Sequence, residues 1–221
     1  MFKLRKIFFI GVLLIVANYL SSCAPRPQED CGFVQNIYGQ RISWKTNSKT
    51  TVKIVIHESV PVELRAAIYR SAATWERQVG HKVIDISEDS TQLTGSPSRD
   101  QKNGIYFLSE WESNKNSEQG RTSVYWAGDQ IQEADIRINA YDFSYYDQNP
   151  QQLIGSYSLK KLGQTARDGY SFEALILHEM GHLLGLKHRD GTTVMATHLA
   201  AFTNRTQLAT TDQSAISCEY K

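Results

Sequence analysis

The chain has 221 residues, with 24 Lys and Arg against 23 Asp and Glu, 41% hydrophobic residues and five prolines. This composition excludes collagen-like, low-complexity and intrinsically disordered chains. The near-neutral charge provides no basic patch for a polyanion, so we expect no nucleic acid among the partners.

The N-terminal segment has the layout of a signal peptide. Three basic residues precede an apolar run from Ile7 to Ala17, which is shorter than the about 20 residues of a membrane-spanning helix. The next segment, Leu20-Ser21-Ser22-Cys23, resembles the lipobox of bacterial lipoproteins. The resemblance implies cleavage before Cys23 and a diacylglyceryl group on its sulfur. We therefore expect residues 1–22 to be a lipoprotein signal peptide, and the lipid to anchor the protein to a bacterial membrane.

The mature chain of 199 residues would carry 21 basic and 23 acidic side chains and is long enough for one domain with its own core. Residues 23–40 are predicted to be a lipidated tether and N-terminal segment, because residues 24–31 are polar and contain two prolines. We expect residues 41–221 to form a monomeric domain. Ala24 after the cysteine favours the outer membrane, by resemblance to lipoproteins of bacteria with two membranes, with the domain facing the periplasm or the cell exterior.

Two cysteines, Cys31 and Cys218, remain near opposite ends of the domain. An exported protein folds where thiols are oxidised, so we favour a disulfide between them. Two free thiols, or Cys31 as a zinc ligand in a latent form, are the alternatives.

Strands dominate the first two-thirds of the predicted domain. The alternation of Val52, Ile54 and Ile56 predicts a strand over residues 51–57. A long amphipathic helix begins near Pro61 and ends at Gly80. Further strands are predicted over residues 83–87, 104–108, 121–127 and 134–140. Residues 141–169 show no sustained period and are interpreted as a long connection, in which four aromatic residues either pack or face substrate: Tyr141, Phe143, Tyr145 and Tyr146.

The second helix carries the chemistry. Ser171 is a candidate N-cap, and His178 and His182 lie four residues apart, so both imidazoles point from one helix face toward one ion. Gly185 is expected to end the helix and to turn the chain, which brings His188 to the same ion. Three imidazoles leave the fourth zinc position open for water. Glu179 is placed to take a proton from this water, whose pKa the metal lowers.

The segment from His178 to His188 resembles the HExxHxxGxxH signature of the metzincin metallopeptidases, and Met195 matches their Met-turn. The similarity is to the matrixins and extends from about residue 41 to the C-terminus. It implies an α+β catalytic domain, with a twisted five-stranded mixed sheet and two long helices above the cleft. A small lower subdomain with a C-terminal helix follows Gly185. It also implies that the edge strand, residues 121–127, pairs with an extended peptide substrate.

Several residues depart from the matrixin pattern. Thr197 stands where matrixins have a Tyr, and His198 either lines the specificity pocket or is an ordinary exposed or packed histidine. His57 and His81 do not reproduce the structural zinc site of the family, so we predict one zinc ion. Calcium binding stays open, because the candidate carboxylates match no known binding loop: Asp129, Glu133, Asp135, Asp142 and Asp147.

These observations predict a lipid-anchored zinc endopeptidase in which zinc-bound water attacks the peptide carbonyl with help from Glu179. One alternative is a non-catalytic, lipid-anchored binding module that retains the metal site. Another is a zinc amidase that acts on cell-wall peptide. Retention of Glu179 disfavours the binding module, because a structural zinc needs no base.

Overall fold

A five-stranded mixed sheet supports the site in the computed structural model, which describes residues 25–46, 51–93 and 95–221. Its strands are β1 (Val52–Ile56), β2 (Ile84–Ser87), β3 (Gly104–Leu108), β4 (Gly120–Ala127) and β5 (Gln130–Asn139). The strand order is β2-β1-β3-β5-β4. Neighbouring strands are parallel except β4, which lies at the edge and pairs antiparallel with β5. The predicted α+β fold is confirmed.

Strand β5 begins four residues earlier than the sequence predicts. Gln130 and Ile131 already pair with Ala127 and Trp126, directly after the turn at Gly128. The first four residues of β5 alternate between exposed and buried. The prediction rested on the later Ile136 and Ile138, so it did not include these residues.

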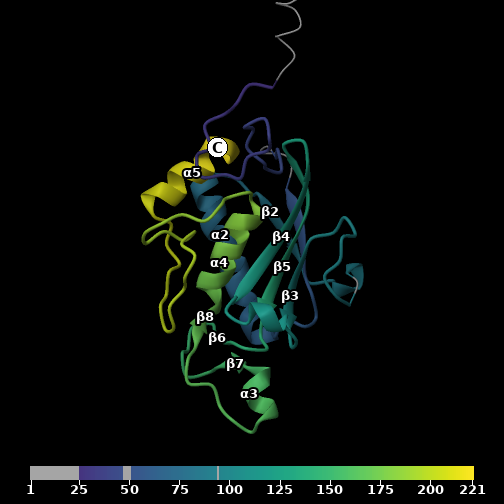
Figure 1. The fold of residues 1–221 in the computed structure, drawn as a ribbon, viewed down its shortest axis with the longest axis vertical. Helices are drawn as coiled ribbons and strands as arrows, with labels where there is room; N and C mark the ends of the chain where they lie inside the picture. Colours follow the sequence, from purple (N-terminus) through teal and green to yellow (C-terminus); the bar gives the residue numbers. More distant parts are fainter. Residues whose placement is uncertain (1–24, 47–50, 94) are drawn as a thin grey trace, which may run out of the picture.

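Two long helices lie side by side next to the sheet (Figure 1). They are α2 (Val62–Val79) and α4 (Phe172–Leu183). Helix α2 ends at Gly80, which adopts a left-handed conformation, as its position after the last apolar residue predicts. Trp75 on α2 is fully buried and donates a hydrogen bond from Nε1 to the carbonyl of Leu177 on α4. This contact ties the two helices together.

The long connection before α4 contains secondary structure that the sequence analysis did not predict. Strands β6 (Ser144–Tyr146), β7 (Ile154–Gly155) and β8 (Tyr170–Ser171) form a second sheet. Helix α3 (Tyr157–Lys161) lies between β7 and β8 in the chain. Strands of two or three residues are too short to show a hydrophobic period. Tyr145 and Tyr146 are buried, so these two aromatic side chains pack within the protein.

The N-terminal segment and the C-terminal helix α5 (Thr210–Tyr220) meet beside the end of α4. Phe33 and Ile42 are buried, and Phe33 pairs with Leu186 in an isolated bridge. A disulfide joins Cys31 to Cys218, with 6.4 Å between the two Cα atoms. Phe33, which precedes the predicted domain boundary at residue 41, therefore belongs to the core.

The predicted signal peptide and Cys23 fall within residues 1–24, which lie outside the described part of the chain. Within the described residues, no helix combines the length and the apolar character needed to cross a bilayer.

Candidate active site

Helix α4 presents two histidines on one face. Ser171 caps the helix, because its side chain accepts a hydrogen bond from the backbone N–H of Ala174. The helix is buried on nearly all sides. His178 and His182 lie one turn apart, as their spacing predicts.

Gly185 turns the chain sharply after α4. Its φ of 101° is unfavourable for residues with a side chain, and a Cβ atom here would overlap the carbonyl oxygen of Ile42. The N–H of Val34 donates to the carbonyl of Gly185, and the N–H of Lys187 donates to the carbonyl of Gly32, both at 2.9 Å. The N-terminal segment therefore holds the turn that leads to His188.

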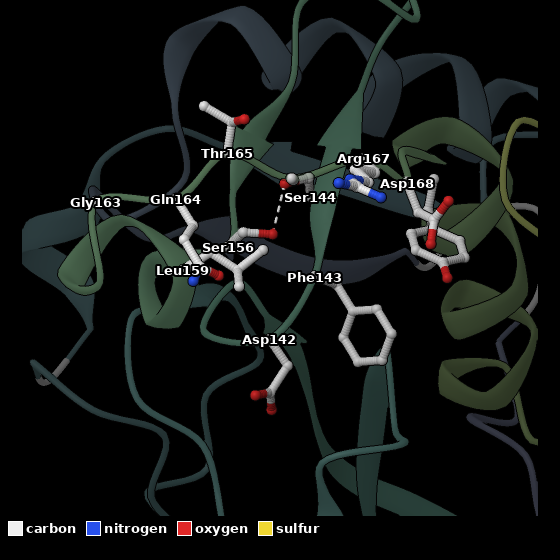
Figure 2. Close-up of a pocket in the computed structure, with 12 residues that line it drawn as sticks. Asp142, Phe143, Ser144, Ser156, Leu159, Gly163, Gln164, Thr165, Arg167 and Asp168 are labelled. Atoms are coloured by element: carbon white, nitrogen blue, oxygen red, sulfur yellow. Dashed lines mark hydrogen bonds between the residues drawn. The ribbon is translucent and has the colours of Figure 1, made fainter.

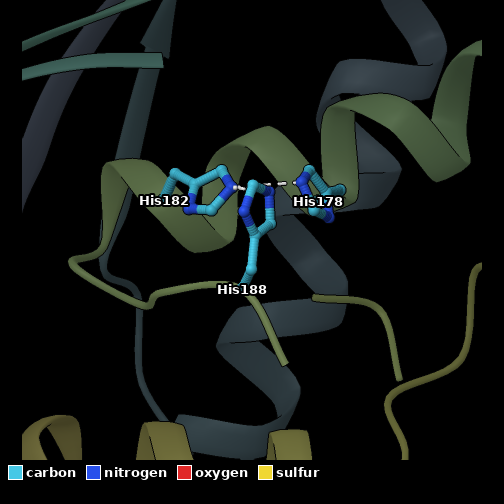
Figure 3. Close-up of side chains that lie close together, drawn as sticks. All are labelled: His178, His182 and His188. Carbon is cyan, nitrogen blue, oxygen red and sulfur yellow. Dashed lines mark hydrogen bonds between the residues drawn. The ribbon is translucent and has the colours of Figure 1, made fainter. Parts of the chain in front are cut away.

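The three imidazoles converge through their Nε2 atoms (Figure 3). His182 Nε2 lies 3.1 Å from both His178 Nε2 and His188 Nε2. The Nδ1 atoms of His178 and His182 each lie 2.8 Å from a backbone carbonyl oxygen, which accepts but cannot donate. Both rings must then carry their proton on Nδ1, so their Nε2 lone pairs face each other. Such an arrangement fits a shared cation, and tetrahedral zinc prefers these ligands.

Burial keeps these imidazoles neutral at pH 7. It lowers the pKa of His178 to about 3 and that of His182 to about 4. Partial desolvation also lowers the pKa of His188, the most exposed of the three imidazoles. Neutral imidazole is the form that binds a metal.

The segment containing Met195 orients the His178 ring through a hydrogen bond. The carbonyl of Val194 is the acceptor for His178 Nδ1. The N–H of Val194 donates in turn to the buried carboxylate of Asp212 on α5, at 2.9 Å. Met195 is buried, and its sulfur packs so closely against Gly181 of α4 that a Cβ atom there would not fit. Asp212 was not singled out from the sequence, because nothing in its local pattern marks a contact 18 residues away.

Glu179 is almost completely buried between α4 and the edge strand. Thr122 on β4 donates a hydrogen bond from Oγ1 to Glu179 Oε2, at 2.7 Å. The other carboxylate oxygen, Oε1, faces Gly120, where an added Cβ atom would lie 2.8 Å away. Burial raises the pKa of Glu179 to about 7, although the hydrogen bond from Thr122 opposes this shift. Sequence reasoning missed Thr122 and Gly120, whose role depends on the pairing register of β4.

A side-chain hydrogen bond connects the residue directly before β4 with the segment after Met195. Gln119 donates from Nε2 to the carbonyl of Leu199, at 3.1 Å. Thr197 and His198, which depart from the matrixin pattern, are both exposed. His198 contributes its carbonyl as an acceptor for Arg205.

Each of the five acidic residues considered for calcium already has a hydrogen-bonding or charged partner within the protein. Asp129 pairs with Lys45, and Asp147 pairs with Arg70. Asp142 accepts a hydrogen bond from Asn139, whereas Glu133 and Asp135 on β5 accept from backbone N–H groups. Within the described residues, only the three histidines form a group of metal-binding side chains.

A cavity of about 720 Å³ lies in the connection before α4 (Figure 2). Phe143 and Arg167 line it together with the buried pair Ser144 and Ser156, whose hydroxyl oxygens are 2.6 Å apart. None of the three histidines lines this cavity. The cavity is therefore separate from the three-histidine site.

The family model of the matrixins matches residues 43–221. No curated protein sequence matches the chain. Among solved structures, high choriolytic enzyme 1, a hatching enzyme zinc-protease from Oryzias latipes (medaka fish), is similar with 11% identity and a TM-score of 0.36. The similarity covers 89% of this chain and 98% of that chain.

Proposed function

The chain belongs to the matrixin family of zinc metallopeptidases, and we propose that it is an endopeptidase held at a bacterial membrane by a lipid on Cys23. The convergence of three Nε2 atoms beside a buried carboxylate carries this proposal. His178, His182 and His188 would hold one zinc ion. When bound there, zinc supplies a Lewis acid that polarises a substrate carbonyl and lowers the pKa of water.

Glu179 acts as the general base in this proposal. Its pKa of about 7 lies near the operating pH, where a carboxyl group both accepts and returns a proton efficiently. Oε2 of Glu179 already accepts a hydrogen bond from Thr122, so Oε1 is the atom that takes the proton from the attacking water. Glycine at position 120 leaves space in front of that oxygen. Glu179 then passes the proton to the leaving amine.

The free edge of β4 is the proposed binding surface for substrate. Strand β4 pairs with β5 along one side, and it is the last strand of the sheet within the described residues. An extended peptide that adds to this edge gains backbone hydrogen bonds regardless of its sequence. Thr122 places Glu179 next to this same strand. Affinity for unfolded or extended protein segments is the expected outcome.

The proposed location is outside the cytoplasm, on the outer membrane. The Cys31–Cys218 disulfide supports an oxidising compartment. The lipobox-like segment before Cys23 supports the anchor. Lipid attachment to Cys23 would be seen as added mass on the N-terminal peptide of the mature protein.

Casein cleavage by the purified full chain tests the catalytic proposal. We expect cleavage that a chelator abolishes and that added zinc restores. Glu179→Gln should lower the rate by a factor of about 10²–10⁴, with zinc content unchanged, because the general base is lost while the ligands remain. Full activity of this variant with zinc bound would refute the role of Glu179. Zinc binding without cleavage in the unsubstituted chain would favour the binding module, and cleavage confined to cell-wall peptide would favour the amidase.

A further inference from the structure

A short turn in the N-terminal segment presents apolar side chains to solvent. Ile37 is 91% exposed, Tyr38 is 55% exposed and Val34 is 37% exposed. We call these three residues the apolar turn. Asn36 fixes its shape, because its Oδ1 atom accepts hydrogen bonds from the N–H groups of Tyr38 and Gln40. The apolar side chains are therefore held outward by the fold.

The apolar turn is also held against the body of the domain. Asn36 donates from Nδ2 to the carbonyl of Gly128, at 3.0 Å, in the turn between β4 and β5. The exposed Trp126 lies two residues before Gly128, so an indole ring belongs to the same end of the molecule. Isolated exposed apolar residues are ordinary on protein surfaces. The apolar turn instead groups three of them within five residues of the chain.

A short stretch of chain connects the proposed lipid attachment point to a residue that is hydrogen-bonded beside the apolar turn. The N–H of Gln28 donates to the carbonyl of Gly39, at 2.8 Å, and Gln35 Nε2 donates to the carbonyl of Gln28. Gly39 directly follows Tyr38. Only five residues lead from Cys23 to Gln28, and five residues span at most about 18 Å. The described N-terminal segment lies at one end of the long axis, and α3 lies at the other (Figure 1).

We propose that the apolar turn docks on the surface of the lipid bilayer, with Ile37 inserted among the acyl chains and Tyr38 at the headgroup level. This inference rests on the proposed lipid at Cys23. Tyrosine and tryptophan favour the boundary between membrane and water, whereas isoleucine favours the apolar interior. The lipid alone leaves the domain free to rotate, and a second contact beside it fixes one orientation. The end that bears α3 would then point away from the membrane.

Fluorescent labelling at single introduced cysteines tests this orientation. The variants are Ile37→Cys and Tyr38→Cys, each in the full chain, purified in detergent and reconstituted into vesicles of phosphatidylethanolamine and phosphatidylglycerol. Leu162→Cys is the matched control, because Leu162 is an apolar residue that is 71% exposed and directly follows α3. Labelling is selective, since Cys31 and Cys218 are bridged and Cys23 would be acylated.

On vesicles, the labels at positions 37 and 38 should shift their emission to shorter wavelength and be quenched by spin-labelled lipid, whereas the label at 162 should show neither effect. Labels at 37 and 38 that behave like the control on vesicle-bound, lipidated protein would overturn the docking and leave the anchor intact. Absence of the lipid from the mature mass would overturn the anchor and the docking together. A shift that needs no vesicles and grows with protein concentration would assign the turn to contacts between copies, and would also overturn the proposal.

Discussion

The two halves of the candidate metal centre are built in different ways. His178 and His182 belong to one helix, and the four-residue spacing places them on one face. The position of His188 depends on contacts with residues far away in the chain. Gly185 packs closely against the carbonyl of Ile42, and the N–H of Lys187 donates a hydrogen bond to the carbonyl of Gly32. Two of the ligands therefore follow from local geometry, whereas the third follows from tertiary packing. Damage to the N-terminal segment should affect the two halves unequally.

Gly185→Ala should have the largest effect on the metal centre, because it disturbs the turn that positions His188. The new Cβ atom would overlap a backbone carbonyl in a conformation that already disfavours side chains. We expect the free energy of unfolding to fall by about 3 kcal/mol or more. Zinc affinity should fall as well, because His188 is displaced. Denaturant unfolding and a zinc competition assay measure these two effects.

Gly191→Ala is the matched control for this substitution. Gly191 also has a positive φ, of 89°, but an added Cβ atom would meet no atom within 4 Å. Its cost should be limited to backbone strain, about 1 kcal/mol. Equal losses in the two variants would show that the close approach to Ile42 is unimportant.

Removal of the disulfide should have the next largest effect. The bridge closes a loop between residues that are 187 positions apart and fastens the N-terminal segment to α5. We expect the paired variant Cys31→Ser and Cys218→Ser to lose about 2–5 kcal/mol of unfolding free energy and to retain zinc. A reducing agent should bring the unsubstituted protein to the same stability. Higher activity of Cys31→Ser alone would instead support the latent form, in which this cysteine covers the metal.

Thr122→Val tests the first half of the centre, where Glu179 follows His178 on α4. Loss of the hydroxyl removes the hydrogen bond to Glu179 Oε2. We expect kcat/KM to fall about tenfold, which corresponds to about 1.4 kcal/mol. The pKa of Glu179 should rise further, because that hydrogen bond lowers it. Thr122→Ser retains the hydroxyl and should restore most of the rate, whereas a serine variant as slow as the valine variant would contradict the role of the hydroxyl.

Asp135 lies on β5, outside both halves of the metal centre, and its substitution should have the smallest effect. Burial raises the pKa of Asp135 from 3.8 to about 6. A carboxyl group with a raised folded-state pKa adds stability below pH 3.8 and loses that contribution as the pH rises through 6. Asp135→Asn should remove this dependence, with a gain of about 1 kcal/mol at pH 8 after solvent screening. Unfolding curves at pH 5 and pH 8 test it, and an unchanged pH dependence in the variant would exclude Asp135 as its source.

The same contrast explains how far the sequence predicts this molecule. The helix bearing His178 and His182, its end before Gly185 and the strand over residues 121–127 were all predicted, because periodicity, turn residues and β-favouring residue types are local signals. The edge position of that strand came from the family resemblance. The buried roles of Phe33 and Ile42 were not predicted, since isolated apolar residues in a polar segment show no period. Thr122 and Asp212 were also missed, because each contacts a residue that only the fold brings near.

X-ray absorption at the zinc edge of the purified protein tests the central claim most directly. Binding of one zinc ion by His178, His182 and His188 predicts three imidazole nitrogens at about 2.0–2.1 Å and an additional light-atom ligand. A sulfur ligand at about 2.3 Å, or fewer than three imidazoles around the metal, would contradict the account.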